Sequence, residues 1–317
     1  MKLLKINYGI RVSLDKWIGL IFQIGDTMET RIVDALILNY NDAVTTRECA
    51  ERLKEYSVIH RVLIVDNNSS DNSFELLSRL NSDKIEVIST GYNGGYGAGN
   101  NFGIRYLKNK YDSTFILLCN PDTIIDEANI KALEDFLLTH PDYAIVAPFM
   151  LNTKEEKQYN TAFRIPKVYE YVASLGVVTN KFRKSFYYPD IQRINDEYID
   201  VGAVSGSLFM MDVKKMIEYG MFDECIFLYC EEVSLGIKLA KSGMKTALLP
   251  QRTFIHNHSI SINKTFKSDV KKHKQLIKSK LYVIKEYYKV NRFIYGLAFL
   301  LSRVSIIEIW LISLLRR

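Results

Sequence analysis

Three polar clusters follow apolar, strand-like stretches in the first half of the chain. They are Asn39-Tyr40-Asn41, Asp66-Asn67-Asn68-Ser69 and Asn120-Pro121-Asp122. Because parallel strands place their carboxyl ends along one edge of a sheet, we expect these clusters to meet in space and form a binding crevice. Asp66 and Asp122 also have a structural alternative, since aspartate stabilises turns and caps helices.

A glycine-rich loop, "GYNGGYGAGNNFG", belongs to the same edge. Glycines let backbone amides approach a ligand, and Gly94, Gly95, Gly97 and Gly99 are most simply turn residues. The spacing Gly97-x-Gly99-x-x-x-Gly103 also resembles a dinucleotide fingerprint. That fingerprint starts directly after its strand, whereas about seven residues separate "KIEVIST" from Gly97, which argues against hydride transfer.

The clusters require a scaffold of alternating strands and helices, and such segments alternate from Arg31 onward. This order predicts an α/β fold with a mainly parallel central sheet flanked by helices. The predicted strands are 31–41, 60–66, 84–90, 115–119, 143–150, 201–212 and 245–250. The predicted helices are 45–56, 72–80, a segment ending near 110, 126–140, 213–220 and 231–243. Residues 151–200 lack a clear period, and we expect loops and short strands there that act as a lid or acceptor surface.

Six motifs occur in order along the chain. They are "LILNYN", "VLIVDNNSSDNS", "NGGYGAGNNFGI", "LLCNPDT", "GSLFMMD" and "FDECIFLYCEEVSLGIKLAKSG". In order and spacing the chain resembles family 2 glycosyltransferases, particularly the bacterial rhamnosyltransferase-like branch. The resemblance implies a nucleotide-sugar-binding domain of GT-A type. It divides the chain into an N-terminal extension (1–30), a GT-A domain (31–261) with a nucleotide-binding half (31–150) and an acceptor half (151–261), and C-terminal helices (262–317).

The resemblance assigns the first polar clusters and the glycine loop to the nucleotide-sugar donor. Asp66 would accept a hydrogen bond from a pyrimidine base, which Asn39 and Tyr40 would frame. The predicted nucleotide-binding residues are Asn39, Tyr40, Asn41, Asp66, Asn68, Asn93, Gly94 and Asn120. Asn100 and Asn101 are further candidates for donor contacts.

Asn120-Pro121-Asp122 occupies the position of the metal-binding Asp-x-Asp of the resembled family, with Asn in place of the first acid. Asp122 would then be the carboxylate ligand of a divalent cation, Mg2+ or Mn2+, with diphosphate and water as further ligands. The motif "FIHNHSIS" adds His256 or His258 as a metal ligand or phosphate contact, and the spacing favours His256. A structural role is the alternative for either histidine.

The resemblance places the catalytic base in "YCEEVSL", where the family usually has Glu-Asp-x-Asp-Leu. Glu232 occupies the position of the Asp that deprotonates the acceptor hydroxyl, and Ser234 that of the second Asp. Glutamate has an unperturbed pKa similar to that of aspartate, so it suits the role. Glu231 is the second candidate. Alternatively, both glutamates are solvated carboxylates in a first helical turn.

The net charge of +6 is concentrated between Lys264 and Arg292, where lysines are frequent. The next segment, "FIYGLAFLLSRVSIIEIWLISLLRR", is nearly long enough to cross a bilayer but contains Arg303 and Glu308. We expect it to lie on an anionic membrane or pack on a partner, with a helical hairpin that closes the globule as the alternative. Since no signal peptide pattern precedes Arg31, we expect a cytoplasmic protein, peripheral on the inner face of the cell membrane. Four cysteines without a CxxC pair predict reduced, mostly buried thiols.

Together these features predict an inverting glycosyltransferase. It would move a sugar from dTDP-rhamnose or a UDP-sugar to a hydroxyl of a growing, lipid-linked cell-surface polysaccharide. The expected partners are the nucleotide-sugar donor, the glycan or lipid-linked glycan acceptor and a membrane surface, without nucleic acid and with the oligomeric state open. Because Glu232 and Ser234 depart from the family pattern, a non-catalytic nucleotide-sugar-binding or scaffold protein is the alternative.

Overall fold

The computed structural model describes residues 31–176, 186–257 and 268–315. Residues 1–30, His258 and the predicted boundary at residue 261 lie outside these ranges. The strands of the main sheet are β1 (Val33–Asn39), β2 (Arg61–Asp66), β3 (Ile85–Ser89), β4 (Phe115–Cys119), β5 (Thr123–Ile125), β6 (Tyr143–Leu151), β8 (Ile199–Val201), β10 (Leu208–Asp212) and β11 (Lys245–His256). A separate pair is formed by β7 (Ala162–Phe163) and β9 (Ala203–Val204).

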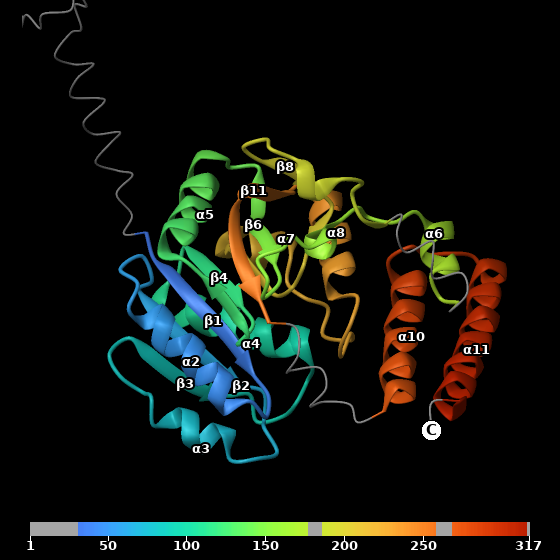
Figure 1. Cartoon of the computed structure of the whole chain (residues 1–317), viewed down its shortest axis with the longest axis horizontal. Coiled ribbons are helices and arrows are strands. Elements are labelled where there is room, and N and C mark those ends of the chain that lie inside the picture. Colours follow the sequence, from blue (N-terminus) through green and yellow to red (C-terminus); the bar gives the residue numbers. More distant parts are fainter. Residues whose placement is uncertain (1–30, 177–185, 258–267, 316–317) are drawn as a thin grey trace, which may run out of the picture.

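The main sheet confirms the predicted α/β class (Figure 1). Its order is β3-β2-β1-β4-β10-β6-β11-β5, with β8 paired to β11. The strands β1, β2, β3, β4, β6 and β11 run in the same direction, whereas β5, β8 and β10 run in the opposite one. The buried aliphatic runs of β1, β2 and β4 suit strands that are covered on both faces.

Two layers of helices cover the sheet. One face packs against α2 (Ala43–Lys54), α3 (Ser73–Ser78) and α5 (Glu127–Thr139). The other packs against α4 (Tyr96–Tyr111), α7 (Val213–Tyr219) and α8 (Glu231–Lys241). Alternate residues of β1 point to the two layers: Ile37 belongs to the first core and Leu36 to the second.

The expectation that Gly97 and Gly99 are turn residues is wrong, because both lie within α4. They allow α4 to pack closely. A Cβ atom at Gly99 would lie 2.5 Å from Leu38 Cδ1, and one at Gly103 would lie 2.4 Å from Leu36 Cδ1. The glycine spacing that resembles a dinucleotide fingerprint therefore serves contact between helix and sheet.

The predicted strand 201–212 is divided into β8, β9 and β10, with Gly202 and Gly206 at the breaks. The strand predicted at 245–250 continues to His256 through an irregularity between Leu249 and Thr253. The described part of residues 151–200 contains the expected loops and short strands, together with η1 (Tyr159–Thr161), α6 (Val168–Ala173) and η3 (Ile191–Arg193).

The C-terminal segment forms a hairpin of α10 (Asp269–Glu286) and α11 (Arg292–Leu315) at one end of the molecule (Figure 1). A third core cluster joins this hairpin to α6, through side chains such as Tyr171, Ile277 and Ala298. The predicted mostly buried thiols are only partly confirmed. Cys49 and Cys119 are buried, whereas Cys225 is exposed and Cys230 half-buried; all four are free thiols.

Candidate functional site

A pocket of about 390 Å³ lies at the edge where β1, β2, β4 and β11 end. Six of the predicted site residues line it: Tyr40, Asn93, Asn120, Glu231, Glu232 and His256. The other six do not belong to its wall: Asn39, Asn41, Asp66, Asn68, Gly94 and Asp122. The convergence of the strand ends thus occurs as expected, while the individual roles of these residues stay predictions.

Asn39 and Asp66 form a buried network beneath the pocket. Asn39 Nδ2 donates to Asp66 Oδ2 at 2.7 Å, and Thr46 Oγ1 donates to Asn39 Oδ1 at 2.8 Å. Ser69 donates to Asp66 twice, from its backbone nitrogen at 2.9 Å and from its hydroxyl at 2.6 Å. Because a carboxylate offers about four acceptor positions, Asp66 keeps capacity for one further donor.

The asparagine beside Asp66 that reaches the pocket is Asn67, which the sequence analysis did not select. Asn67 is buried, lines the pocket and donates to Asn93 Oδ1 at 3.1 Å and to the Gly95 carbonyl at 3.0 Å. Asn68 is exposed and has a left-handed backbone, with φ of 57°. Both asparagines follow the end of β2, so no local pattern in the sequence shows which of them faces the pocket.

Gly95 joins the glycine loop to the segment before α8. Its φ is +89°, and a Cβ atom there would lie 2.0 Å from the Phe227 carbonyl oxygen. The next backbone nitrogen, of Tyr96, donates to that same oxygen at 3.0 Å. Only glycine meets both requirements, so this residue sets the distance between two walls of the pocket.

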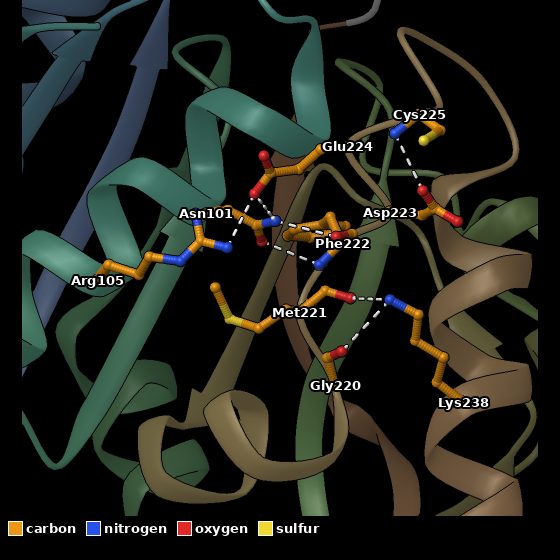
Figure 2. Close-up of polar contacts among 9 residues, drawn as sticks. All are labelled: Asn101, Arg105, Gly220, Met221, Phe222, Asp223, Glu224, Cys225 and Lys238. Atoms are coloured by element: carbon orange, nitrogen blue, oxygen red, sulfur yellow. Dashed lines mark hydrogen bonds and ion pairs between the residues drawn. The ribbon is translucent and has the colours of Figure 1, made fainter.

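The segment 220–230 carries part of the pocket wall and is fixed to α4 and α8 (Figure 2). Asn101 of α4 exchanges two 2.9 Å hydrogen bonds with the backbone of Phe222, and donates to Glu224. This last hydrogen bond lowers the pKa of Glu224. Lys238 of α8 donates to two carbonyls of the same segment. Asn100 and Asn101 are fully buried and do not line the pocket, so the expectation that they contact a ligand is not supported.

The start of α8 presents two adjacent carboxylates. Tyr229 and Cys230 directly before it both have left-handed backbones, with φ of 71° and 75°. Such consecutive non-glycine outliers are costly and typically occur where a site must be oriented. They turn the chain so that Glu231 and Glu232 lie in the first helical turn and in the pocket wall.

Glu231 and Glu232 have different surroundings. Glu231 is 4% exposed, and its Oε1 accepts no hydrogen bond from the described residues. Burial, together with the charge of Glu232, raises the pKa of Glu231 well above its ordinary value. Glu232 is half-buried, and its Oε1 lies 3.4 Å from the backbone nitrogen of Gly206. Ionisation of Glu231 is therefore disfavoured, and Glu232 is the more accessible carboxyl group of the pair.

Asp122 and His256 meet through a short strand that the sequence analysis did not predict. β5 runs antiparallel to β11 with Thr123 opposite His256, which brings Asp122 Oδ1 to 3.2 Å from His256 Nε2. Asp122 Oδ1 is buried and accepts no hydrogen bond of good geometry within the described ranges. A carboxylate oxygen beside an imidazole nitrogen is a pair of donor atoms that could bind a divalent cation.

The protein contributes few ligands to such a cation. Among the residues that the structure describes, no group of three or more His, Cys, Asp or Glu side chains could hold a metal ion. Asp122 and His256 would be its protein ligands, and diphosphate and water would complete the coordination, as is common for Mg2+.

The far wall of the pocket comes from the helical hairpin and from residues 151–200. Leu276 and Lys280 of α10 line it, and Lys280 Nζ donates to the Ser174 carbonyl at 2.7 Å. Aromatic residues face the same space: Phe163, Tyr171, Phe186 and Tyr187. The contribution of α10 was not expected, since its sequence pattern indicates only a basic amphipathic helix.

Comparison with known sequences identifies the family of the chain. A profile described as Glycosyl transferase family 2 matches residues 34–220. Low-salt glycan biosynthesis hexosyltransferase Agl10 of Haloferax volcanii is 26% identical over 225 residues, covering 71% of this chain and 67% of that protein. Rhamnosyltransferase WbbL of Escherichia coli (strain K12) is 25% identical over 218 residues, covering 61% and 76%. N-acetylglucosaminyl-diphospho-decaprenol L-rhamnosyltransferase of Mycobacterium tuberculosis is 25% identical over 209 residues, covering 63% and 67%.

Solved structures show the same fold at 12% identity. GalNAc-T7 with UDP, GalNAc and Mn2+ matches with a TM-score of 0.59, over 83% of this chain and 49% of that chain. This chain thus spans about half the length of GalNAc-T7. Mannosyltransferase PcManGT from Pyrobaculum calidifontis, in complex with GDP-Man and Mn2+, matches with a TM-score of 0.53, over 86% and 70%. These likenesses confirm the GT-A fold, and because the family profile covers more than half of the chain, the protein is a glycosyltransferase that belongs to glycosyl transferase family 2.

Proposed function

We propose that this glycosyltransferase is an inverting enzyme that transfers a sugar from dTDP-rhamnose or a UDP-sugar to a hydroxyl of a growing, lipid-linked cell-surface glycan. The names of two relatives, both rhamnosyltransferases, support the choice of rhamnose, and one of those names includes a diphospho-decaprenol acceptor. A related solved structure that contains UDP and Mn2+ supports a nucleotide-sugar donor.

The observation that carries the proposal is the placement of Glu232 in the same pocket as Asn120 and His256. Glu232 is half-buried, whereas the adjacent Glu231 is buried and its ionisation is disfavoured. A general base must reach both the acceptor hydroxyl and solvent for its proton to be released. Glu232 meets this requirement better than Glu231.

In the proposed reaction, the acceptor oxygen attacks the anomeric carbon as the bond from that carbon to the diphosphate oxygen breaks. The hydroxyl proton passes to the Glu232 carboxylate. Direct displacement requires the acceptor to approach opposite the leaving group, so the pocket must hold donor and acceptor in line. A divalent cation bound by Asp122 and His256 would offset the charge of the departing diphosphate.

The acceptor side is supported by the aromatic wall formed by Phe163, Tyr171, Phe186 and Tyr187. Aromatic rings offer large apolar faces, and tyrosine adds a hydroxyl for hydrogen bonding. A glycan presents both apolar ring faces and hydroxyls. This wall lies in residues 151–200, the segment expected to form the acceptor surface.

Calorimetric titration with UDP and dTDP, with and without Mn2+, tests the donor site. We expect the wild type to bind one of these nucleotides in a metal-dependent manner, and Asp122→Ala to lose this binding. Asp126→Ala is the matched control, because it removes a carboxylate that is exposed at the start of α5, whereas Asp122 is buried beside His256. Absence of binding to either nucleotide would contradict the donor assignment.

A non-catalytic nucleotide-sugar-binding protein of the same fold is the second candidate. The observation in its favour is Ser234, which occupies the position of the second family acid. Its side chain is buried and donates to the Glu231 carbonyl at 2.9 Å, so it supplies no carboxylate to the pocket. Such a protein would bind the nucleotide without releasing it from a donor sugar in the presence of any acceptor.

A further inference from the structure

Helix α11 turns its most apolar side to solvent. Large side chains recur every three or four residues along this side and are 46–81% exposed: Phe293, Leu297, Leu300, Val304, Ile307, Leu311 and Leu314. We call these residues the α11 face. Phe299 and Trp310 extend the face on one flank and are 42% and 51% exposed. A continuous apolar surface of this kind marks a site of interaction.

The side of α11 that packs against α10 and the third core cluster carries small residues together with Ile294, Leu301 and Ile306. Ala298, Ser302 and Ser305 are buried there, and Ser305 Oγ lies 2.6 Å from His273 Nε2 of α10. A helix on the surface of a globular protein normally buries its apolar side and exposes its polar side. Helix α11 is apolar on its packed side and also exposes a second side of large apolar residues, which favours an apolar occupant for the α11 face.

Helix α10 carries a row of exposed lysines. Lys271, Lys274, Lys278 and Lys285 are exposed and follow one another at intervals of three, four and seven residues. At 3.6 residues per turn these positions lie within a sector of about 60° of the helix surface. Lys285 is paired with Glu286 at 3.0 Å, and both groups are exposed. The hairpin thus combines an apolar face with a positively charged row.

We propose that the hairpin of α10 and α11 docks on an anionic lipid bilayer. The α11 face enters the boundary between headgroups and acyl chains, and the lysine row of α10 contacts the lipid phosphates. Charge complementarity favours this occupant. The face, widened by Phe299 and Trp310, is also broader than the narrow seam through which two helices pair in a coiled coil.

The docked arrangement differs from a membrane-spanning one. Among the described residues, Arg292–Leu314 forms one helix that is long and apolar enough to cross a membrane by length and composition. However, it carries Arg303 and Glu308, and the side of α11 opposite the α11 face packs against α10. Arg303 lies over the Phe299 ring at 4.6 Å, and its long side chain can extend to the headgroups of a bilayer surface.

Docking would also position the pocket, because Leu276 and Lys280 of the same α10 line it. The bilayer would then lie near the wall through which a lipid-linked acceptor enters. This consequence rests on the proposed function, whereas the docking itself does not.

Flotation with vesicles tests the proposal on the full chain. We expect binding to phosphatidylcholine vesicles that contain phosphatidylglycerol, weaker binding to phosphatidylcholine alone, and release at high salt. The double variant Leu300→Glu/Ile307→Glu should bind at least about tenfold more weakly. Ile217→Glu on α7 is the matched control, since Ile217 is 44% exposed outside the hairpin, and should bind like the wild type. Substitution of Lys271, Lys274 and Lys278 by Gln should reduce both binding and its salt dependence.

Equal flotation of the wild type and Leu300→Glu/Ile307→Glu would overturn the proposal. A second result would also overturn it: neither protein binds vesicles, and sedimentation velocity shows that the wild type is a dimer while the variant is a monomer. In that case a second copy of the chain would cover the α11 face. Circular dichroism and nucleotide titration of the variant show whether the fold and the donor site are intact. Loss of vesicle binding with intact nucleotide binding separates failure of docking from failure of the proposed function.

Discussion

Asp122 Oδ1 lies 3.2 Å from His256 Nε2, at the place where the short strand β5 pairs with the end of β11. The Asn257 backbone nitrogen donates to the Asp122 carbonyl at 3.0 Å, which extends the pairing by one residue. The backbone pairing thus holds the two residues side by side before any ligand binds. Such preorganisation suits a metal site that is completed by the diphosphate of an incoming donor.

Asp122→Asn should weaken Mn2+ binding in the presence of UDP or dTDP by about tenfold or more, because the amide retains the shape but loses the charge of the ligand. Electron paramagnetic resonance of free Mn2+ measures this directly. Asp126→Asn is the control and should bind like the wild type. Unchanged Mn2+ affinity in Asp122→Asn would show that the cation lies elsewhere.

Gly95→Ala should destabilise the protein far more than Gly243→Ala. Both residues have positive φ, but a Cβ atom at Gly243 has nothing within 4 Å, whereas one at Gly95 would lie 2.0 Å from the Phe227 carbonyl oxygen. We expect about 1–2 kcal/mol for the positive φ at Gly243. The loss at Gly95 should be larger, because its ψ of −176° is essentially restricted to glycine and the added Cβ atom would clash. Urea unfolding measures the difference, and equal losses would contradict the close approach of the two pocket walls.

Tyr96→Phe should reduce turnover severalfold and stability by about 1–2 kcal/mol. The Tyr96 hydroxyl donates to the Gly206 carbonyl at 2.5 Å, and the Gly206 nitrogen faces Glu232. Burial and the charge of Glu232 raise the pKa of Tyr96, so this hydroxyl remains a donor. Tyr106→Phe on the same helix is the control, because Tyr106 binds Glu86 away from the pocket. Equal effects of both variants on kcat would exclude a positioning role for Tyr96.

Glu231→Gln should make stability less dependent on pH. Below about pH 4.3, the ordinary pKa of glutamate, Glu231 is protonated in the folded and unfolded states alike. Above it the unfolded chain releases this proton while the folded protein keeps it, since burial and Glu232 raise the folded pKa. Stability therefore falls as the pH rises toward the folded pKa, by at most about 1.4 kcal/mol per pH unit.

Urea unfolding between about pH 5 and about pH 8 tests this prediction, because the decline should be smaller in Glu231→Gln. Glu51→Gln, at an exposed position of α2, should show the wild-type decline. An unchanged decline in Glu231→Gln would mean that Glu231 is not the group that retains its proton on folding.

The order of elements and the edge that binds the donor could be predicted, because apolar runs, turn residues and polar strand ends are local signals. The prediction correctly gathered Tyr40, Asn120 and His256 around one pocket. It failed where a side chain's direction depends on tertiary contacts. Asn67 rather than Asn68 lines the pocket. Asn101 does not face the pocket and instead donates a hydrogen bond to the Phe222 carbonyl.

Other features have no local signal at all. The three-residue strand β5 exists only through its pairing with β11, which the sequence does not reveal. The sequence therefore could not predict that Asp122 lies beside His256. Likewise, Lys280 belongs to a lysine-rich helix whose pattern suggests exposure, yet it is 6% exposed and lines the pocket. Its burial depends on the docking of α10 against Ser174.

The central claim is that Glu232 deprotonates the acceptor in a nucleotide-sugar transfer. The most direct measurement is the rate of nucleoside diphosphate release from UDP-sugars and dTDP-rhamnose, with lipid-linked glycan acceptors, for the wild type, Glu232→Gln and Glu231→Gln. We expect Glu232→Gln to bind the nucleotide like the wild type but to turn over about 10²- to 10⁴-fold more slowly, while Glu231→Gln retains most activity. Wild-type turnover in Glu232→Gln would contradict the assignment of the base, and tight nucleotide binding without release by the wild type would identify a non-catalytic protein.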